Sequence, residues 1–101
     1  MYKPQPASDW PESWQLSFSY DRMEVFDCKI NLAYFNSYKN RSKCLLSQIE
    51  RLLPSGSTII DLAAGSGNFT LLLAEMGYRT IWNDLRSDLV PYVQAKYEKG
   101  E

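Results

Sequence analysis

The stretch IIDLAAGSGNFTLLLAEMG, residues 59–77, places an acidic side chain and a run of small residues between two apolar segments. Residues 58–63 begin with β-branched side chains and lack polar alternation, which predicts a short parallel strand covered on both faces. After the small residues, FTLLLAEM has the length of a helix and stops before Gly77, a residue typical of the position after a helix end. The stretch therefore predicts a strand, a tight loop and a helix in succession.

Helices and a second strand are predicted on either side of this unit. Residues 41–53 repeat apolar side chains at helical spacing and end at a Pro-Ser-Gly cluster. Residues 78–82 are β-branched and aromatic, which predicts a strand. Ser87 is the expected N-cap of a last helix, with Pro91 in its first turn and its end near Lys99. Alternating helices and strands predict a parallel sheet with right-handed crossovers, an α/β fold of Rossmann-like layout.

The first forty residues carry weaker signals. Residues 1–20 are rich in proline, serine and aromatic side chains without a clean period, which predicts a loop or short turns packed on a folded body. Residues 21–40 can begin a helix, but several Asn and Ser residues lower the helix propensity and predict interruptions. We therefore divide the chain into an aromatic-rich, irregularly helical cap, residues 1–40, and a sheet-forming part, residues 41–101.

The composition excludes several classes of function. The 101 residues are 45% hydrophobic with a formal net charge of −1, which is typical of one globular domain or part of one and gives no basic surface for nucleic acid. No apolar run approaches the roughly 20 residues that span a bilayer, and the polar N-terminus has no signal-peptide core, so a cytoplasmic location is expected. The absence of histidine excludes Ser-His-Asp catalysis and His-ligated zinc, and Cys28 and Cys44 are expected to be free thiols rather than a metal or disulfide pair.

The small-residue loop is a candidate ligand site. Gly65 and Gly67 permit tight backbone geometry and let a ligand approach main-chain N–H groups. Ligands of parallel sheets bind beyond the carboxyl ends of the strands, where this loop is predicted to lie. Glycines alone leave a second interpretation open, in which the loop serves only the close packing of strand and helix.

Two carboxylates narrow the choice of ligand. Asp61 ends the first predicted strand and Asp84 ends the second, 23 positions later. A dinucleotide site has an apolar residue at the place of Asp61 and a third small residue at the place of Thr70, so an NAD or FAD site is disfavoured. An acid at the first position suits a cationic ligand, such as a sulfonium that carries an ammonium group, and Asp84 is placed to accept both hydroxyls of a ribose.

The segment DLAAGSGNFTLLLAEMGYRTIWNDL, residues 61–85, resembles motif I through the second-strand acid of the class I S-adenosylmethionine-dependent methyltransferases. The likeness covers about residues 57–98 and has one departure, because Ala63 stands where the family usually has its first glycine. Alanine is a mild change there unless the position requires a positive φ. The resemblance implies a Rossmann-like methyltransferase fold, S-adenosyl-L-methionine as the cofactor, and residues 41–101 as the first half of the cofactor-binding domain.

The resemblance also implies roles for individual residues. Asp61 would help to hold the cofactor's ammonium group through water or backbone, Asp84 would bind the ribose hydroxyls, and Leu85 would lie against the adenine. Arg41 is the candidate cation for the cofactor's carboxylate. Plainer roles are open as well: a turn cap or polar loop residue for either acid, a core position for Leu85, and a solvent-facing helix position for Arg41. The predicted cofactor site comprises Asp61, Ala63, Ala64, Gly65, Ser66, Gly67, Asp84, Leu85 and Arg41.

The family's later strands have no counterpart in this sequence. We therefore expect these 101 residues to be the N-terminal portion of a methyltransferase that is inactive without the missing C-terminal part, and we assign no catalytic residue, methyl acceptor or metal. Two alternatives stay open: a non-catalytic S-adenosylmethionine-binding or interaction module and, less favoured, part of an NAD or FAD site. The first predicted strand would also have an unpaired edge, which predicts self-association.

Overall fold

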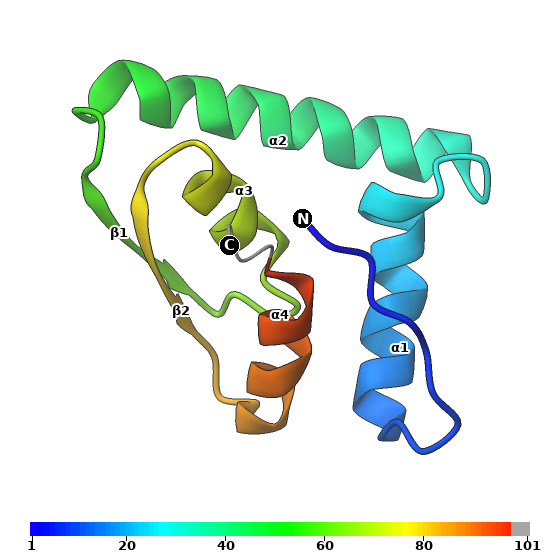
Figure 1. Cartoon of the computed structure of the whole chain (residues 1–101). Helices are drawn as coiled ribbons and strands as arrows, with labels where there is room; N and C mark the ends of the chain where they lie inside the picture. Colours follow the sequence, from blue (N-terminus) through cyan, green and yellow to red (C-terminus); the bar gives the residue numbers. More distant parts are fainter. Residues whose placement is uncertain (98–101) are drawn as a thin grey trace.

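The structure, a computed structural model, describes residues 1–97 as helices arranged around a small parallel sheet (Figure 1). Its strand and helix alternation confirms the predicted α/β class and is compatible with part of a Rossmann-like fold. In chain order the elements are α1 (Glu12–Asp21), the π-helical turn η1 (Arg22–Phe26), α2 (Leu32–Leu52), β1 (Thr58–Leu62), α3 (Asn68–Glu75), β2 (Arg79–Asn83), the 3-10 turn η2 (Ser87–Leu89) and α4 (Val90–Lys96).

β1 and β2 pair in parallel, and α3 forms the crossover between them. The register pairs Thr58 with Arg79 at one end and Leu62 with Asn83 at the other. Both predicted strands are confirmed to within one residue at each end. Because the strands run in the same direction, the loop after β1 and the residues after β2 emerge at one edge of the sheet.

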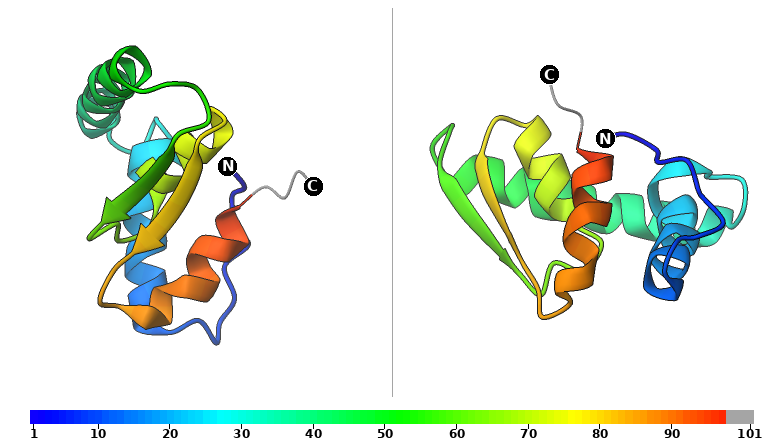
Figure 2. Two further views of the ribbon diagram at one scale, coloured as in Figure 1. Left: turned by 90° about the vertical axis from the view of Figure 1, so that its left-hand side faces the viewer. Right: turned by 60° about the horizontal axis from the view of Figure 1, so that its bottom comes forward.

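Only one face of this sheet is covered within residues 1–97. The helices α3 and α4 lie on the same side of the two strands (Figure 2). On the opposite face, Ile60, Leu62 and Ile81 are 58%, 72% and 49% exposed, because alternate side chains of a strand point to opposite faces. The prediction that the first strand is buried on both faces is therefore wrong for the described part of the chain.

The N-terminal region contains a helix where loop or short turns were expected. α1 begins at Glu12, because Trp10, Trp14 and Phe18 recur every four residues and place their rings on one side of the chain. Both tryptophan rings lie 5.9 Å from the ring of Tyr92 on α4. Phe18 and Tyr92 belong to the buried core cluster, so α1 is fixed by aromatic packing between distant segments.

α2 is longer than the helix that was predicted over residues 41–53. It begins at Leu32, where the side chain of Asn31 accepts a hydrogen bond from the Tyr34 N–H and caps the helix. The helix interruption predicted within residues 21–40 lies between the end of η1 at Phe26 and the start of α2 at Leu32. The proposed division between residues 40 and 41 falls inside α2. No helix within residues 1–97 has both the length and the apolar character to cross a membrane.

The last helix begins differently from the prediction. Ser87 is not its N-cap, because Ser87 opens the η2 turn and no side chain caps that turn. α4 has Pro91 in its first turn, as predicted, and ends at Lys96. The predicted end near Lys99 lies outside the described residues.

Candidate functional site

Residues 63–67 connect the carboxyl end of β1 to α3 at the edge where β2 also ends (Figure 1). The Ala64 N–H donates to the Asn83 carbonyl at 2.9 Å, and the Gly67 N–H donates to the Ala64 carbonyl at 3.0 Å. The loop is therefore tied to the end of β2 and folded back on itself. This is the place that the sequence predicted for a ligand-binding loop.

The loop contains three left-handed backbone positions. Ala63, Gly65 and Gly67 have φ values of +55°, +58° and +80°, and Ala63 is the non-glycine residue with positive φ in residues 1–97. A left-handed conformation costs a residue with a Cβ about 1–2 kcal/mol. The position where Ala63 departs from the resembled glycine motif thus does have positive φ here, and Ala63 strains the loop.

The two glycines have different surroundings. A Cβ added to Gly67 would lie 2.8 Å from Val93 Cγ1 on α4 and 3.3 Å from Trp82 Cδ1. At Gly65, the contact is with Nη2 of Arg86, at 3.1 Å. Close packing therefore accounts for Gly67, whereas Gly65 faces the end of a flexible charged side chain.

Asp84 joins the end of β2 to the loop. Its Oδ2 accepts the Gly65 N–H at 2.8 Å, and its Oδ1 accepts the Arg86 backbone N–H at 2.9 Å and the Arg86 Nε at 3.2 Å. The Arg86 backbone N–H, then its side chain, and then the Gly65 N–H lower the pKa of Asp84 to about 2. Asp84 is therefore anionic at neutral pH, and it already holds the loop at Gly65.

Asp61 lies at the start of the same loop and contacts α3. Its Oδ2 accepts the hydroxyl of Thr70 at 2.6 Å, while Oδ1 accepts no hydrogen bond from residues 1–97. The side chain of Thr70, which stands where a dinucleotide site has a small residue, is thus the partner of the first acid. The bond places a carboxylate beside the first turn of α3.

Leu85 and Arg41 are both exposed, but Leu85 lies just after β2 and Arg41 lies on α2. Leu85 directly follows Asp84 and is fully exposed, so it is not a core residue within residues 1–97. Arg41 is exposed on α2, and its side chain makes no hydrogen bond or ion pair with another described residue; its guanidinium carbon lies 5.9 Å from the ring centroid of Tyr38. The Tyr38 ring lies 5.7 Å from that of Phe69 in α3.

A buried carboxylate that the sequence did not single out lies behind the loop. Asp21, the last residue of α1, is fully buried and accepts hydrogen bonds from Ser66 Oγ (2.9 Å), Asn68 Nδ2 (2.8 Å), Tyr92 OH (2.7 Å) and Lys96 Nζ (2.8 Å). Its partners are 45 to 75 positions away in the chain. No local pattern marks Asp21, because only the tertiary fold brings these donors together.

Lys96 is the cation of this cluster and is also fully buried. Its Nζ donates to Asn68 Oδ1 at 2.8 Å as well as to Asp21. Burial lowers the pKa of Lys96, and the neighbouring Asp21 opposes that shift. Burial and Asp21 both raise the pKa of Tyr92, so the tyrosine remains a hydroxyl donor at neutral pH.

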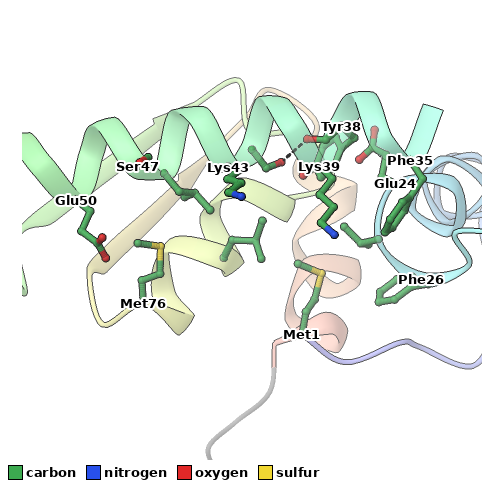
Figure 3. A pocket seen from close by; sticks show the side chains of 14 residues that line it. Met1, Glu24, Phe26, Phe35, Tyr38, Lys39, Lys43, Ser47, Glu50 and Met76 are labelled. Carbon is green, nitrogen blue, oxygen red and sulfur yellow. Dashed lines mark hydrogen bonds between the residues drawn. The ribbon is translucent and has the colours of Figure 1, made fainter. Parts of the chain in front are cut away.

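Two cavities of the molecule are lined by residues other than those of the predicted site. A groove of about 640 Å³ lies between η1, α2 and α3, with Phe35, Leu72 and Met76 among its lining residues (Figure 3). A second cavity of about 780 Å³ lies between α3, β2 and α4. Neither is lined by any of the nine predicted cofactor residues.

Comparison with known proteins gives one similarity. The chain is 34% identical over 53 residues to a Bacillus subtilis (strain 168) protein named "Putative methyltransferase YqeM". The aligned segment covers 52% of this chain and 22% of the length of that relative. No protein-family model matches the chain, and no solved structure matches it. The similarity indicates a relationship to a methyltransferase over about half of the chain.

Proposed function

We propose that this chain is the cofactor-binding portion of a class I S-adenosyl-L-methionine-dependent methyltransferase. The observation that carries the proposal is the geometry at the carboxyl edge of the sheet, where a small-residue loop lies between Asp61 at the end of β1 and Asp84 just after β2. Asp84 is hydrogen-bonded to the loop at Gly65, and the exposed Leu85 follows it. The similarity to a methyltransferase supports the same interpretation.

The residues after β2 fit the nucleoside half of this cofactor. Asp84 is anionic, and each carboxylate oxygen can accept more than one hydrogen bond, so a ribose hydroxyl can share Oδ2 with the Gly65 N–H. Leu85 offers an exposed apolar surface for the adenine ring. Gly65 has no Cβ, which leaves its backbone open to the ligand on the side that Arg86 now borders.

The charged side chains of Asp61 and Arg41 fit the methionine half of the cofactor. The Oδ1 atom of Asp61 is available to a cationic ammonium group, directly or through water, while Oδ2 stays bonded to Thr70. Arg41 is the proposed partner of the cofactor's carboxylate, and Ala63, Ala64 and Ser66 would border the methionine and ribose. These roles place opposite charges next to each other, which favours binding.

The bound cofactor supplies an electrophilic methyl group on its sulfonium. The residues of this chain bind and orient it, and methyl transfer depends mainly on such positioning relative to the acceptor. We assign no acceptor-contacting residue within residues 1–97. A cytoplasmic location, without membrane or nucleic-acid partners, belongs to the same proposal.

A second candidate function is a non-catalytic interaction module. It is favoured by the exposed Ile60, Leu62 and Ile81 on the bare face of the sheet, because contiguous apolar surface of this kind marks interaction sites. A nicotinamide or flavin dinucleotide site is less favoured, because the bond between Asp61 and Thr70 holds a negative charge near the helix end that a pyrophosphate would approach.

Calorimetry with S-adenosylhomocysteine, S-adenosylmethionine and NAD tests the proposal. We expect the first two ligands to bind and NAD not to bind. Asp84→Ala should weaken S-adenosylhomocysteine binding at least about tenfold, because charge-assisted hydrogen bonds to the ribose are lost. Asp27→Ala is the matched control, because Asp27 also pairs with an arginine and has a lowered pKa but lies outside the loop. Equal affinity of both variants for S-adenosylhomocysteine would show that Asp84 does not bind the ribose.

A further inference from the structure

The two oxygens of the buried Asp21 face different parts of the molecule. Oδ1 accepts Ser66 Oγ and Asn68 Nδ2, which belong to the loop and to the first residue of α3. Oδ2 accepts Tyr92 OH and Lys96 Nζ, which belong to α4. One carboxylate at the end of α1 therefore joins the loop to the last helix.

Ser66 is a further point at which the loop is held, besides Ala64 and Gly65. Among residues 63–67 it alone has a polar side chain, and it stands between two glycines with positive φ. Glycine-flanked backbone has many accessible conformations. The hydrogen bond from Ser66 Oγ to Asp21 is thus the contact that a side chain of the loop itself makes, and it adds to the bonds that Asp84 and Trp82 make with Gly65.

Asn68 extends the same connection to the other N-terminal elements. Its Nδ2 also donates to Glu24 Oε2 at 2.9 Å, and Glu24 Oε1 accepts the Tyr34 hydroxyl at 3.1 Å. These bonds link η1 and α2 to the residue that begins α3. Four buried or half-buried polar side chains from the N-terminal part and α3 therefore meet where the loop ends.

The α1 helix is fixed by hydrogen bonds to the η2 turn, so Asp21 at its end can hold the loop in place. Trp14 Nε1 donates to the Asp88 carbonyl at 2.8 Å, and Ser13 Oγ donates to Asp88 Oδ2 at 2.5 Å. A buried ion pair such as Asp21 with Lys96 adds little net stability compared with apolar packing. The ion pair does fix the orientation of the surrounding side chains, because each donor to a buried carboxylate with all its hydrogen bonds made has a defined position.

We propose that Asp21 is a positioning residue for the ligand-binding loop: through Ser66 it holds residues 64–68 in the conformation that accepts the cofactor. The N-terminal segment and the loop then behave as one unit, and loss of the link loosens the loop without unfolding the chain. The effect on cofactor affinity rests on the proposed function, whereas the effect on the loop does not.

Ser66→Ala in the 101-residue chain tests the link, because it removes the loop contact and leaves the bonds of Asp21 to Tyr92 and Lys96 in place. Ser57→Ala is the matched control, since the Ser57 hydroxyl also makes one hydrogen bond from a connecting segment, in its case to the Pro54 carbonyl. Amide hydrogen exchange at Gly65 and Gly67 should speed up at least about fivefold in Ser66→Ala and stay unchanged in the control, with exchange in the middle of α3 unchanged in both.

A double-mutant cycle identifies Asp21 as the partner. In a chain with Asp21→Ala and Lys96→Met, which removes the acceptor of Ser66 and leaves no buried unpaired charge, Ser66→Ala should have little further effect on loop exchange. Unchanged loop exchange in Ser66→Ala alone would overturn the proposal even if the double variant failed to fold. A uniform rise of exchange over the whole chain would also overturn it, because that result reports general destabilisation.

Affinity measurements separate this inference from the proposed function. We expect Ser66→Ala to weaken S-adenosylhomocysteine binding about threefold to tenfold relative to the wild-type chain and Ser57→Ala. If the wild-type chain does not bind S-adenosylhomocysteine, the proposed function fails, while loop exchange still decides the role of Asp21. Faster loop exchange with unchanged affinity would show that the held conformation is not the one the cofactor needs.

Discussion

Gly67→Ala should destabilise the chain strongly, and Gly56→Ala provides a control with the same backbone conformation. Gly67 and Gly56 have φ values of +80° and +81°, so alanine suffers similar left-handed strain at both positions. That strain costs about 1–2 kcal/mol and is partly offset by about 0.4–1 kcal/mol from the reduced entropy of the unfolded chain. The two substitutions therefore differ only in what the new Cβ contacts.

The contacts at the two positions are very different. Nothing lies within 4 Å of a Cβ at Gly56, whereas at Gly67 it would lie 2.8 Å from Cγ1 of Val93. Val93 is buried and β-branched, so its side chain has little freedom to turn away. Overpacking of this kind costs about 1–3 kcal/mol. We expect Gly67→Ala to be less stable than Gly56→Ala by about 2 kcal/mol.

Thermal and urea unfolding measure this difference. In a chain of this size, 2 kcal/mol corresponds to a decrease in Tm of about 10 °C relative to the control. Adding Val93→Ala to Gly67→Ala should recover part of the loss, because the clashing methyl groups are removed. Equal stability of Gly67→Ala and Gly56→Ala would refute the conclusion that the loop packs directly on α4.

Three further results are expected. Gly65→Val should abolish S-adenosylhomocysteine binding while circular dichroism shows the helices unchanged, because a branched side chain would occupy the ligand's approach to the backbone; retained affinity would make the loop a packing element only. The pKa of Asp84 falls from 3.8 to about 2 on folding, so its stabilising contribution is present above about pH 4 and is lost as the pH falls toward 2. The free energy of unfolding in urea should therefore depend less on pH over this range in Asp84→Asn than in the wild-type chain. An identical pH dependence would contradict the hydrogen bonds assigned to Asp84. Sedimentation should show concentration-dependent self-association that Ile60→Lys reduces, because β1 has an unpaired edge and Ile60 is exposed on the bare face; a monodisperse monomer at all concentrations would contradict this expectation.

The central unit of the fold was predictable because its signals are local. Residues 58–83 contain β-branched strands, a glycine loop and a helix of ordinary length, and each is specified by neighbouring residues. The placement of Asp84 and the loop at the same end of the sheet also followed, because parallel strands end together, whereas the hydrogen bond between Asp84 and Gly65 was not predicted. The ligand roles of these residues stay predictions.

The remaining features depend on contacts between distant segments. α1 is stabilised by rings that pack on Tyr92, and Asp21 is buried by donors from the loop, α3 and α4. The spacing of Trp10, Trp14 and Phe18 is present in the sequence, but their packing partner Tyr92 is distant, and the donors around Asp21 leave no pattern at all. The positive φ of Ala63 was likewise hidden, because it results from the path of the loop between β1 and the Asn83 carbonyl that holds Ala64.

Chemical-shift mapping of S-adenosylhomocysteine on the isotope-labelled 101-residue chain tests the central claim most directly. We predict that saturable shift changes concentrate on the backbone amides of Gly65, Ser66, Asp84 and Leu85. Changes confined to the groove lined by Phe35, Leu72 and Met76, or no changes at millimolar ligand, would contradict the claim that the carboxyl edge of the sheet is an S-adenosylmethionine site.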